Sequence, residues 1–224
     1  MLTLLLVGHG KMGKLVESLA ASHDCRVAAV VTNRAQLASA PAGVDVAIDF
    51  SVPGAVVETV AELAARGISV VIGTTGWLEH EAEVRAAVER SDIGAIAAAN
   101  FSLGMNIFQR VVEQSAKAFA ARPDVGAWIH EAHHSAKKDA PSGTALLLKR
   151  AMTHGGYTRT IDVSSTRAGA IPGTHTVGFD GPAETVTLTH TVRDRAVFAH
   201  GALEAAKWLH GRRGWFTMSD MLGT

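Results

Sequence analysis

The chain has 224 residues, of which 47% are hydrophobic and 19% are charged, the composition of an ordinary globular enzyme. Its 21 basic and 21 acidic side chains cancel, and aromatic residues make up 5%, which argues against a nucleic-acid-binding protein. No apolar stretch approaches the roughly 20 residues of a membrane helix, which argues against a membrane protein. A single cysteine, Cys25, excludes an intramolecular disulfide framework and predicts a protein of the reducing cytoplasm.

The first part of the chain alternates strands with helices. Continuous apolar runs, typical of strands buried on both faces, occur at residues 2–7, 25–31, 44–50, 68–72 and 94–98. Helical patterns follow several of them, from residue 13 to about 21, at 53–66 and at 78–90. Because such alternation requires parallel pairing through right-handed crossovers, we expect a Rossmann-type doubly wound parallel sheet.

The pattern changes after Asn100. We expect a long amphipathic helix, a strand and a second helix, at 103–120, 125–131 and 142–152. Strands rich in Thr and Val, separated by Gly and Pro turns, favour an antiparallel or mixed sheet at 161–166, 174–179 and 184–191. A last helix is expected at 198–210. The sequence therefore predicts a dinucleotide-binding domain of residues 1–102 and 198–224, with an α+β substrate domain inserted at 103–197.

A glycine-rich loop follows the first strand, with the sequence Gly8, His9, Gly10, Lys11, Met12, Gly13. Its position between a buried strand and a helix is the context that dinucleotide binding requires. The first glycine permits a tight turn, the second lets the backbone approach a pyrophosphate, and the third lets the helix pack against the strand. The helix N-terminus then attracts the phosphates. The alternative is a glycine turn that binds no ligand.

The residues after the second strand bear on the choice between NADH and NADPH. NAD-binding domains usually place Asp or Glu there to bind the ribose 2′-hydroxyl, whereas this chain has Thr32, Asn33 and Arg34. No carboxylate in this stretch repels a 2′-phosphate, and the Arg34 guanidinium could pair with one. We therefore expect NADPH to be accepted, alone or beside NADH. The alternative for Arg34 is an exposed surface charge.

Two further loops lie at the carboxyl ends of predicted strands, where doubly wound sheets bind their ligands. They are Gly73-Thr74-Thr75 and Ala99-Asn100-Phe101-Ser102. Small and hydroxyl side chains allow a nicotinamide to approach closely, although ordinary turn chemistry explains them equally well.

A histidine cluster, His130-Glu131-Ala132-His133-His134, contains the pattern HExxH. That pattern binds zinc only on a helix, where residues four apart share a face. In the strand predicted here, His130 and His134 would lie roughly 13 Å apart. The sequence therefore predicts no metal site.

The residues that follow favour proton transfer to a bound anion. Ser142, Gly143 and Thr144 open a helix, and the free N–H groups there can hold a small carboxylate. Lys137 supplies a positive charge, and the adjacent histidines can donate protons. The alternative is a helix cap beside surface charges.

The stretch from Glu131 to Ala145, EAHHSAKKDAPSGTA, is similar to the signature E-x-H-H-x-x-K-x-D-A-P-S-G-T-A of the dihydrodipicolinate reductases. Other blocks of that family also have counterparts here, so that the similarity runs nearly end to end. They lie at residues 71–76, 100–106, 167–175, 198–209 and 218–222.

The resemblance implies the reduction of 4-hydroxy-tetrahydrodipicolinate, a cyclic dicarboxylate, by NADPH or NADH in lysine biosynthesis through diaminopimelate. It implies that His133 is the proton donor and Lys137 its catalytic partner. Substrate binding is implied for His134, Gly143 and Thr144, with Ser142 beside them. Cofactor contacts are implied for the glycine loop and for the loops at 73–75 and 99–102. A homotetramer assembled through the inserted sheet domain is implied as well.

Two rival functions remain at this point, a non-catalytic nicotinamide-sensing protein and a related amino-acid dehydrogenase. A sensor needs the glycine loop but not the block from His133 to Thr144, so the sequence disfavours it. The chain departs from the family in lacking the usual acidic residue after the second strand. We expect His154 and His175 to be surface or structural residues.

Overall fold

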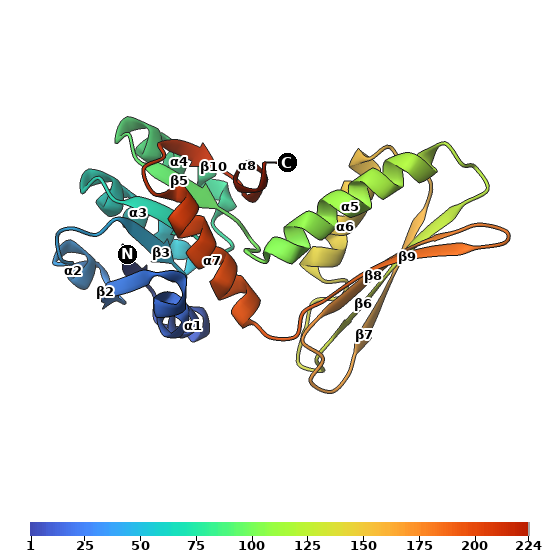
Figure 1. Ribbon diagram of the computed structural model, residues 1–224, viewed down its shortest axis with the longest axis horizontal. Helices are drawn as coiled ribbons and strands as arrows, with labels where there is room; N and C mark the ends of the chain where they lie inside the picture. The colour runs from blue at the N-terminus through green and yellow to red at the C-terminus, as the bar shows by residue number, and fades with distance from the viewer. Residues whose placement is uncertain (224) are drawn as a thin grey trace. The chain divides into compact units, whose positions relative to one another are not determined.

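The computed structural model of the protein describes residues 1–223, and these form two compact units (Figure 1). The first unit comprises Met1–Leu103 together with the chain from Ala196 onward. The second unit is the intervening segment, Gly104–Arg195. Each unit has its own sheet and its own hydrophobic core.

A six-stranded sheet forms the centre of the first unit, in the order β10-β5-β4-β3-β1-β2. Every pair of neighbouring strands in it is parallel. The order reverses at β1, which pairs with β2 on one side and β3 on the other, so the predicted doubly wound parallel sheet is confirmed. The strands are β1 (Leu2–Val7), β2 (Cys25–Val31), β3 (Val46–Asp49), β4 (Ser69–Ile72), β5 (Gly94–Ala97) and β10 (Gly214–Phe216).

Helices cover both faces of this sheet. Along β1, Leu4 and Leu6 belong to one core and Leu5 and Val7 to the other, because successive side chains of a strand point to opposite faces. The core of Leu4 includes side chains from α1 (Lys11–Leu19), α7 (Ala196–Leu209) and α8 (Met218–Leu222). The core of Leu5 includes side chains from α2 (Arg34–Ala38), α3 (Val56–Ala65) and α4 (Glu81–Arg90).

The structure contains short elements that the sequence did not predict. They are α2, α8 and β10; in addition, one end of each predicted helix in this unit's first half is a 3₁₀ turn, at Ala20–His23, Pro53–Ala55 and Leu78–His80. Three to five residues are too few to show a hydrophobic period, so only tertiary contacts reveal such elements. One of them matters for the fold: β10 pairs with β5 and forms one edge of the six-stranded sheet.

The second unit is a four-stranded mixed sheet in the order β7-β6-β8-β9. The β6–β7 pair is parallel and the other two pairs are antiparallel, as a mixed sheet requires. Two helices, α5 (Leu103–Ala120) and α6 (Gly143–His154), lie on one side of this sheet (Figure 1), and their side chains form the core of the unit together with the sheet. The strands are β6 (Gly126–His133), β7 (Ile161–Arg167), β8 (Thr174–Asp180) and β9 (Thr185–Thr191).

Strand β6 changes character along its buried face. Ala127, Ile129, Glu131 and His133 alternate with more exposed neighbours and are all buried. The first two pack in the apolar core, whereas the last two are ionisable. The period-2 geometry of a strand therefore places a carboxylate and an imidazole side by side at the end of a core strand.

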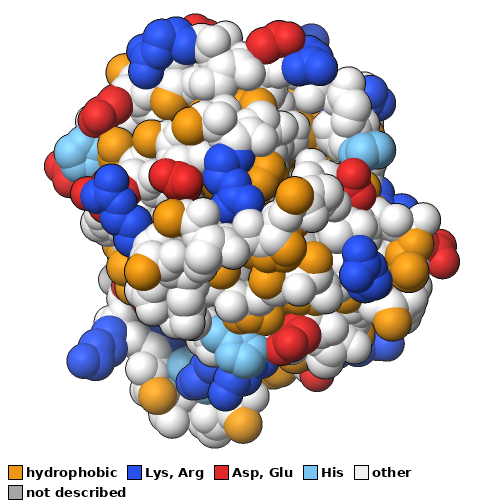
Figure 2. Space-filling view, turned by 90° about the vertical axis from the view of Figure 1, so that its left-hand side faces the viewer, with side chains coloured by type: hydrophobic (Ala, Val, Ile, Leu, Met, Phe, Trp, Pro, Cys, Tyr) orange, Lys and Arg blue, Asp and Glu red, His pale blue; other side chains and the backbone are white. Residues whose placement is uncertain are grey.

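The surface carries charges of both signs. On the face shown in Figure 2, Lys and Arg side chains are interspersed with Asp and Glu and do not gather into one basic patch. Of the helices described, none is both long and apolar enough to cross a membrane.

Candidate active site

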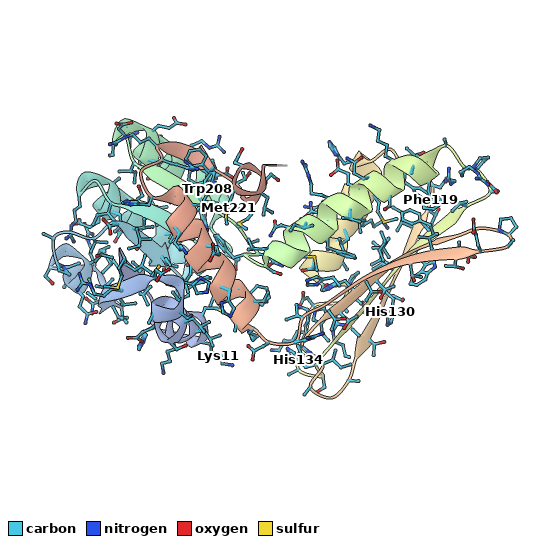
Figure 3. All side chains as sticks on the ribbon, viewed as in Figure 1. Lys11, Phe119, His130, His134, Trp208 and Met221 are labelled. Atoms are coloured by element: carbon cyan, nitrogen blue, oxygen red, sulfur yellow. The ribbon has the colours of Figure 1, made fainter. Side chains whose placement is uncertain are left out.

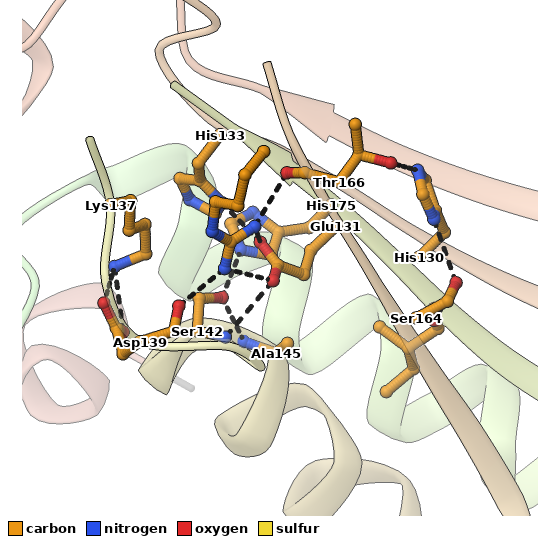
Figure 4. A network of polar contacts seen from close by, with 12 residues as sticks. His130, Glu131, His133, Lys137, Asp139, Ser142, Ala145, Ser164, Thr166 and His175 are labelled. Carbon is orange, nitrogen blue, oxygen red and sulfur yellow. Dashed lines mark hydrogen bonds and ion pairs between the residues drawn. The ribbon is translucent and has the colours of Figure 1, made fainter. Parts of the chain in front are cut away.

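A buried network of polar side chains lies at the carboxyl end of β6 (Figure 4). Glu131 is fully buried, and its carboxylate contacts Nδ1 of His133. From the neighbouring strand β7, Arg167 donates hydrogen bonds of 2.6 and 3.0 Å to the two oxygens of the same carboxylate. Because Nδ1 faces an acceptor, we infer that it carries a proton, which leaves Nε2 to exchange protons with a ligand. Gly173 faces Nε2, where an added Cβ would lie only 3.2 Å away.

The ionisable groups of this network have shifted pKa values. Burial raises the pKa of Glu131, but hydrogen bonds, chiefly from Arg167, outweigh it and lower the pKa to about 2. Burial lowers the pKa of His133, although the charge of Glu131 opposes this. Burial, assisted by the charge of His133, lowers the pKa of His175 to about 4. At neutral pH, Glu131 is therefore ionised and His175 is neutral.

His175 is a member of the network, not a surface residue. It lies directly opposite Glu131 on β8 and is only 3% exposed. Its ring meets that of His133 edge to face, with 5.0 Å between centroids, and its Nε2 is 3.1 Å from Oγ of Ser142. The possibility of a surface position, which the sequence left open, is therefore wrong.

Ser142 joins the network to the start of α6. Its Oγ accepts a hydrogen bond from the N–H of Ala145 as the N-cap of the helix. Its own N–H donates to Glu131 over 3.3 Å, and the residue is 1% exposed. Both polar groups of Ser142 are thus used inside the protein. Of the residues predicted to bind substrate here, Gly143 is exposed and Thr144 is half-buried.

The segment between β6 and α6 contains the other predicted residues. His134 follows β6 directly and is half-buried, and its carbonyl accepts the N–H of Lys137 over 3.1 Å. The Lys137 ammonium binds both oxygens of Asp139, at 2.8 and 2.9 Å. The Asp139 carbonyl accepts a 2.6 Å hydrogen bond from Arg167, which ties the segment to the buried network. Hydrogen bonds from Lys137 and from the Gly143 N–H lower the pKa of Asp139.

The HExxH pattern does not form a helical zinc motif. His130 lies within β6 and contacts Oγ of Ser164 at 2.9 Å, whereas His134 lies beyond the strand (Figure 3). A different set, Glu131, His133 and His175, brings one potential ligand atom from each side chain within 4.8 Å of the others. Arg167 already binds both oxygens of Glu131, and its positive charge opposes a second cation there.

A cavity of about 320 Å³ lies in the first unit, at the carboxyl ends of β1, β2 and β3. Its size is within the usual range of small-molecule sites. It is lined by Val7, Gly8, His9, Gly10, Thr32, Asn33, Arg34, Leu37, Phe50, Ser51, Val52, Ala55, Glu58 and Thr59.

The three glycines of the loop have the roles that a dinucleotide site assigns to them. Gly8 has φ +88°, and a Cβ there would lie 2.4 Å from the carbonyl oxygen of Phe50. A Cβ at Gly13 would lie 2.2 Å from the carbonyl oxygen of Gly8, so the helix packs closely on the loop. Gly10 has no heavy atom within 4 Å of its Cβ position, so space remains for a ligand at the N-cap of α1. Lys11 and Met12 begin that helix.

Phe50 connects the cavity with the two other predicted loops. A Cβ at Gly73 would lie 2.1 Å from its ring, and the ring of Phe101 meets it nearly edge to face at 6.4 Å. Thr74 is buried and donates to Asp49 over 3.1 Å, whereas Thr75 is exposed. In the last loop Ala99 is exposed, Ser102 is buried, and the Asn100 side chain accepts the Ser102 N–H. Neither loop lines the cavity itself.

The structure also adds a carboxylate to the cavity that the sequence argument missed. Glu58 on α3 lies 3.4 Å from Arg34, across the cavity lining. The residues that follow the second strand, where such an acid usually lies, include no carboxylate. The carboxylate comes instead from a helix 24 residues later in the chain.

A doubly wound sheet with a glycine loop and a cavity at the ends of its strands is the arrangement of a dinucleotide-binding protein, and the inserted unit adds a buried histidine network. The family model "Dihydrodipicolinate reductase, N-terminus" matches residues 2–101, and "Dihydrodipicolinate reductase, C-terminus" matches residues 104–222. The chain therefore belongs to the dihydrodipicolinate reductase family, and the resemblance inferred from its motifs is confirmed.

Several similar proteins are named 4-hydroxy-tetrahydrodipicolinate reductase. The 4-hydroxy-tetrahydrodipicolinate reductase of Caldanaerobacter subterraneus is 38% identical, with 99% of this chain and 98% of the relative aligned. The reductase of that name from Christiangramia forsetii is 34% identical, over 97% and 96% of the two chains. These relatives and the family models confirm that the chain is an oxidoreductase that uses NADH or NADPH.

Solved structures share the fold at lower identity. A dipicolinate-bound dihydrodipicolinate reductase from Paenisporosarcina sp. TG-14 superposes with a TM-score of 0.82, at 22% identity over 99% of each chain. A probable dehydrogenase from Thermotoga maritima has a TM-score of 0.58 at 9% identity, over 92% of this chain and 86% of its own.

Proposed function

We propose that this protein is a 4-hydroxy-tetrahydrodipicolinate reductase, which reduces that cyclic dicarboxylate to tetrahydrodipicolinate with NADPH or NADH: the substrate gains one hydride and one proton, and its 4-hydroxyl group leaves as water. One observation carries the assignment of the chemistry: His133 is buried, is fixed through Nδ1 by Glu131, and has Nε2 next to Gly173, which has no side chain to cover it. Beside it are a lysine and a helix N-terminus suited to a carboxylate.

The first unit binds the cofactor through backbone and small side chains. The N–H groups at the start of α1 and the open space at Gly10 fit a pyrophosphate. From there the cavity extends to Asn33 and Arg34, where the rest of the dinucleotide can lie. The loops at 73–75 and 99–102 flank Phe50 and complete the proposed cofactor contacts. When bound, the reduced nicotinamide supplies hydride.

The second unit binds the substrate and supplies the proton. The N–H groups of Gly143 and Thr144 and the Lys137 ammonium hold one carboxylate, and His134 helps to hold the dianion. Ser142 fixes the start of the helix as its cap, and in this arrangement it does not touch the substrate itself. Asp139 holds Lys137 and the Gly143 N–H until the substrate carboxylate competes for both groups.

His133 donates the proton from Nε2. Burial lowers its pKa in the ligand-free protein, so the neutral ring predominates at neutral pH. A bound dicarboxylate adds negative charge nearby, which raises the pKa of His133 and favours the imidazolium. The positive charge on the ring then meets the Glu131 carboxylate at Nδ1, and Lys137 assists by orienting the substrate. Glu131 and Arg167 are positioning residues, because they act through His133.

We further propose a place for the enzyme and a state of assembly. The family resemblance supports a role in lysine biosynthesis through diaminopimelate, in the cytoplasm. It also supports a homotetramer formed through the sheet of the second unit. Many side chains of β7 and β9 in that sheet are exposed in the single chain, which leaves them available for such contacts. Sedimentation of the purified protein tests the tetramer.

A coupled absorbance assay tests the reaction. After dialysis against EDTA, the full chain is given 4-hydroxy-tetrahydrodipicolinate with NADPH or with NADH, and loss of the reduced nicotinamide is followed. We expect substrate-dependent oxidation of at least one cofactor, and metal analysis should find far less than one zinc per chain. No oxidation of either cofactor, or turnover only with an amino-acid substrate, would falsify the assignment. Activity that EDTA abolishes and zinc restores would assign a metal to the Glu131, His133 and His175 cluster instead.

A further inference from the structure

The rim of the cofactor cavity carries one acid and one guanidinium on different elements. Arg34 begins α2 directly after β2, and Glu58 lies in the first turn of α3. Nη1 of Arg34 is 3.4 Å from Oε2 of Glu58, and both residues line the cavity. Among the described residues of the lining, Glu58 is the one carboxylate.

The other polar side chains at the end of β2 are committed to the local backbone. The Asn33 side chain accepts the N–H of Gln36 as the N-cap of α2. The Thr32 hydroxyl lies 3.1 Å from the Gln36 side-chain oxygen, which also accepts the Thr32 N–H. Local caps therefore use these groups, which leaves Arg34 and Glu58 as the charged side chains that a ribose at this rim would meet.

The glycine loop fixes which part of a dinucleotide reaches this rim. In a doubly wound domain the pyrophosphate lies at the glycine loop, and the adenosine ribose lies at the end of the second strand. The cavity joins these two places, since Gly8 and Gly10 line it together with Arg34 and Glu58. A ribose hydroxyl can donate to a carboxylate, whereas a 2′-phosphate is repelled by it and attracted to a guanidinium.

We propose that Glu58 is a specificity-determining residue that sets the balance between NADH and NADPH. With NADH, Glu58 accepts hydrogen bonds from the ribose hydroxyls and keeps Arg34 beside it. With NADPH, Arg34 leaves Glu58 for the 2′-phosphate, and the carboxylate opposes the phosphate. Glu58 thus supplies from α3 the acid that is missing after β2. The inference rests on the proposed use of both cofactors.

The expected effects are moderate, because both side chains are largely in water. The exposed fractions are 76% for Arg34 and 64% for Glu58, so solvent and salt screen the pair. We expect Glu58→Gln to tighten binding of NADPH by roughly threefold to tenfold and to weaken binding of NADH by a similar factor.

Direct binding tests the proposal on the full chain. The Kd values of NADPH, NADH, adenosine 2′,5′-bisphosphate and 5′-AMP are measured by calorimetry for the wild type and for Glu58→Gln. Glu62→Gln is the matched control, because it removes the same charge one turn along α3 and Glu62 does not line the cavity. We expect the affinities for the bisphosphate and AMP to move in opposite directions in Glu58→Gln alone. Equal changes for both ligands, or changes no larger than those of Glu62→Gln, would overturn the proposal.

A second variant separates the two roles of Glu58. In an Arg34→Ala background, Glu58→Gln should still weaken AMP and NADH binding, because the carboxylate contacts the ribose itself. Loss of that effect would mean that Glu58 acts only through Arg34, and would overturn the ribose contact. These ligands bind without any turnover, so their affinities do not depend on which substrate is reduced. If Glu58→Gln shifts the two affinities in opposite directions but the wild type fails the reductase assay, the proposed reaction is wrong and the role of Glu58 stands.

Discussion

The two units each contain an ion pair with a guanidinium, and the two pairs differ in almost every physical respect. In the second unit, the Glu131 and Arg167 side chains are 0% and 17% exposed and are joined by hydrogen bonds of 2.6 and 3.0 Å. In the first unit, Arg34 and Glu58 are 76% and 64% exposed and share one contact of 3.4 Å. Water cannot replace a lost partner in the buried pair of Glu131 and Arg167, whereas it readily does so in the exposed pair of Arg34 and Glu58.

The difference matches what each site has to do. Breaking a buried pair costs roughly 3–5 kcal/mol, whereas an exposed pair is worth about 0–1 kcal/mol. A proton donor needs one fixed orientation, and the buried pair supplies it to His133, the proposed donor. Discrimination between two cofactors needs side chains that rearrange with the ligand, and the exposed pair allows that. The predictions below remove one part of this contrast at a time.

The largest effect should follow removal of the groups that we propose to contact the substrate. We expect His133→Ala and Lys137→Ala to lower kcat by roughly 10²–10⁴, the range for losing acid–base catalysis. The Kd of the cofactor should barely change, because neither residue belongs to the cavity in the first unit. Steady-state kinetics and cofactor titration check both statements. Lys138→Ala and His154→Ala are the matched controls, and near-wild-type turnover of both test variants would remove these residues from the mechanism.

A smaller effect should follow removal of the carboxylate behind His133. Glu131→Gln keeps the shape but leaves Arg167 without its charged partner, so we expect a loss of roughly 3–5 kcal/mol of stability. We also expect kcat to fall by about 10², since the His133 tautomer and orientation are no longer fixed. Glu131 raises the pKa of His133, so the pKa seen in kcat/KM should move to lower pH in the variant.

The pH profile separates positioning from mere folding. Measurements are made at a temperature where the variant is folded, with the exposed Glu184→Gln as control. If kcat falls but the pH profile stays where it is in the wild type, Glu131 only supports the fold.

The smallest effect concerns stability between pH 7 and pH 5. The pKa of His175 is about 4 in the folded chain, against 6.5 for an ordinary histidine. The unfolded chain therefore binds more protons between these values, so stability must fall as the pH falls. We expect His175 to account for about 2 kcal/mol of that loss, with His133 and His190 adding in the same direction because burial lowers their pKa values too.

Denaturant unfolding at the two pH values measures this loss. Replacing His175 by Asn should flatten the dependence, and it should do so more than the same replacement at the exposed His154, which is the control. If the free energy of unfolding of the His175 variant depends on pH as strongly as that of the wild type, the pKa of His175 is not lowered by its burial. Glu131 does not interfere, because its pKa shift acts below pH 4.5.

The sequence predicts those features whose residues are neighbours in the chain. Long apolar strands, the glycine loop and the segment from His133 to Thr144 are continuous, so pattern and spacing suffice to find them. The rest of the network depends on strand register. Glu131 and His133 meet Arg167 only because β6 and β7 pair in parallel with His133 opposite Arg167, and they meet His175 only through the antiparallel pairing with β8.

Register and strand order are set by non-local contacts, which a single sequence does not display. One signal was nevertheless present, since the alternation that buries Ala127 and Ile129 also places Glu131 on the core face. Glu58 gave no comparable signal, because an exposed Glu in the first turn of a helix is an ordinary residue.

The return of the chain to the first unit has a consequence for biosynthesis. The core on one face of the nucleotide sheet needs Ala202, Leu203 and Leu209 of α7, and the edge of the sheet needs β10. All of these lie after Arg195, so a ribosome makes them after the whole of the second unit. The second unit, which is continuous in the chain, can form its sheet while the first unit still has one face bare. The part of the protein that is translated first is therefore the part that finishes folding last.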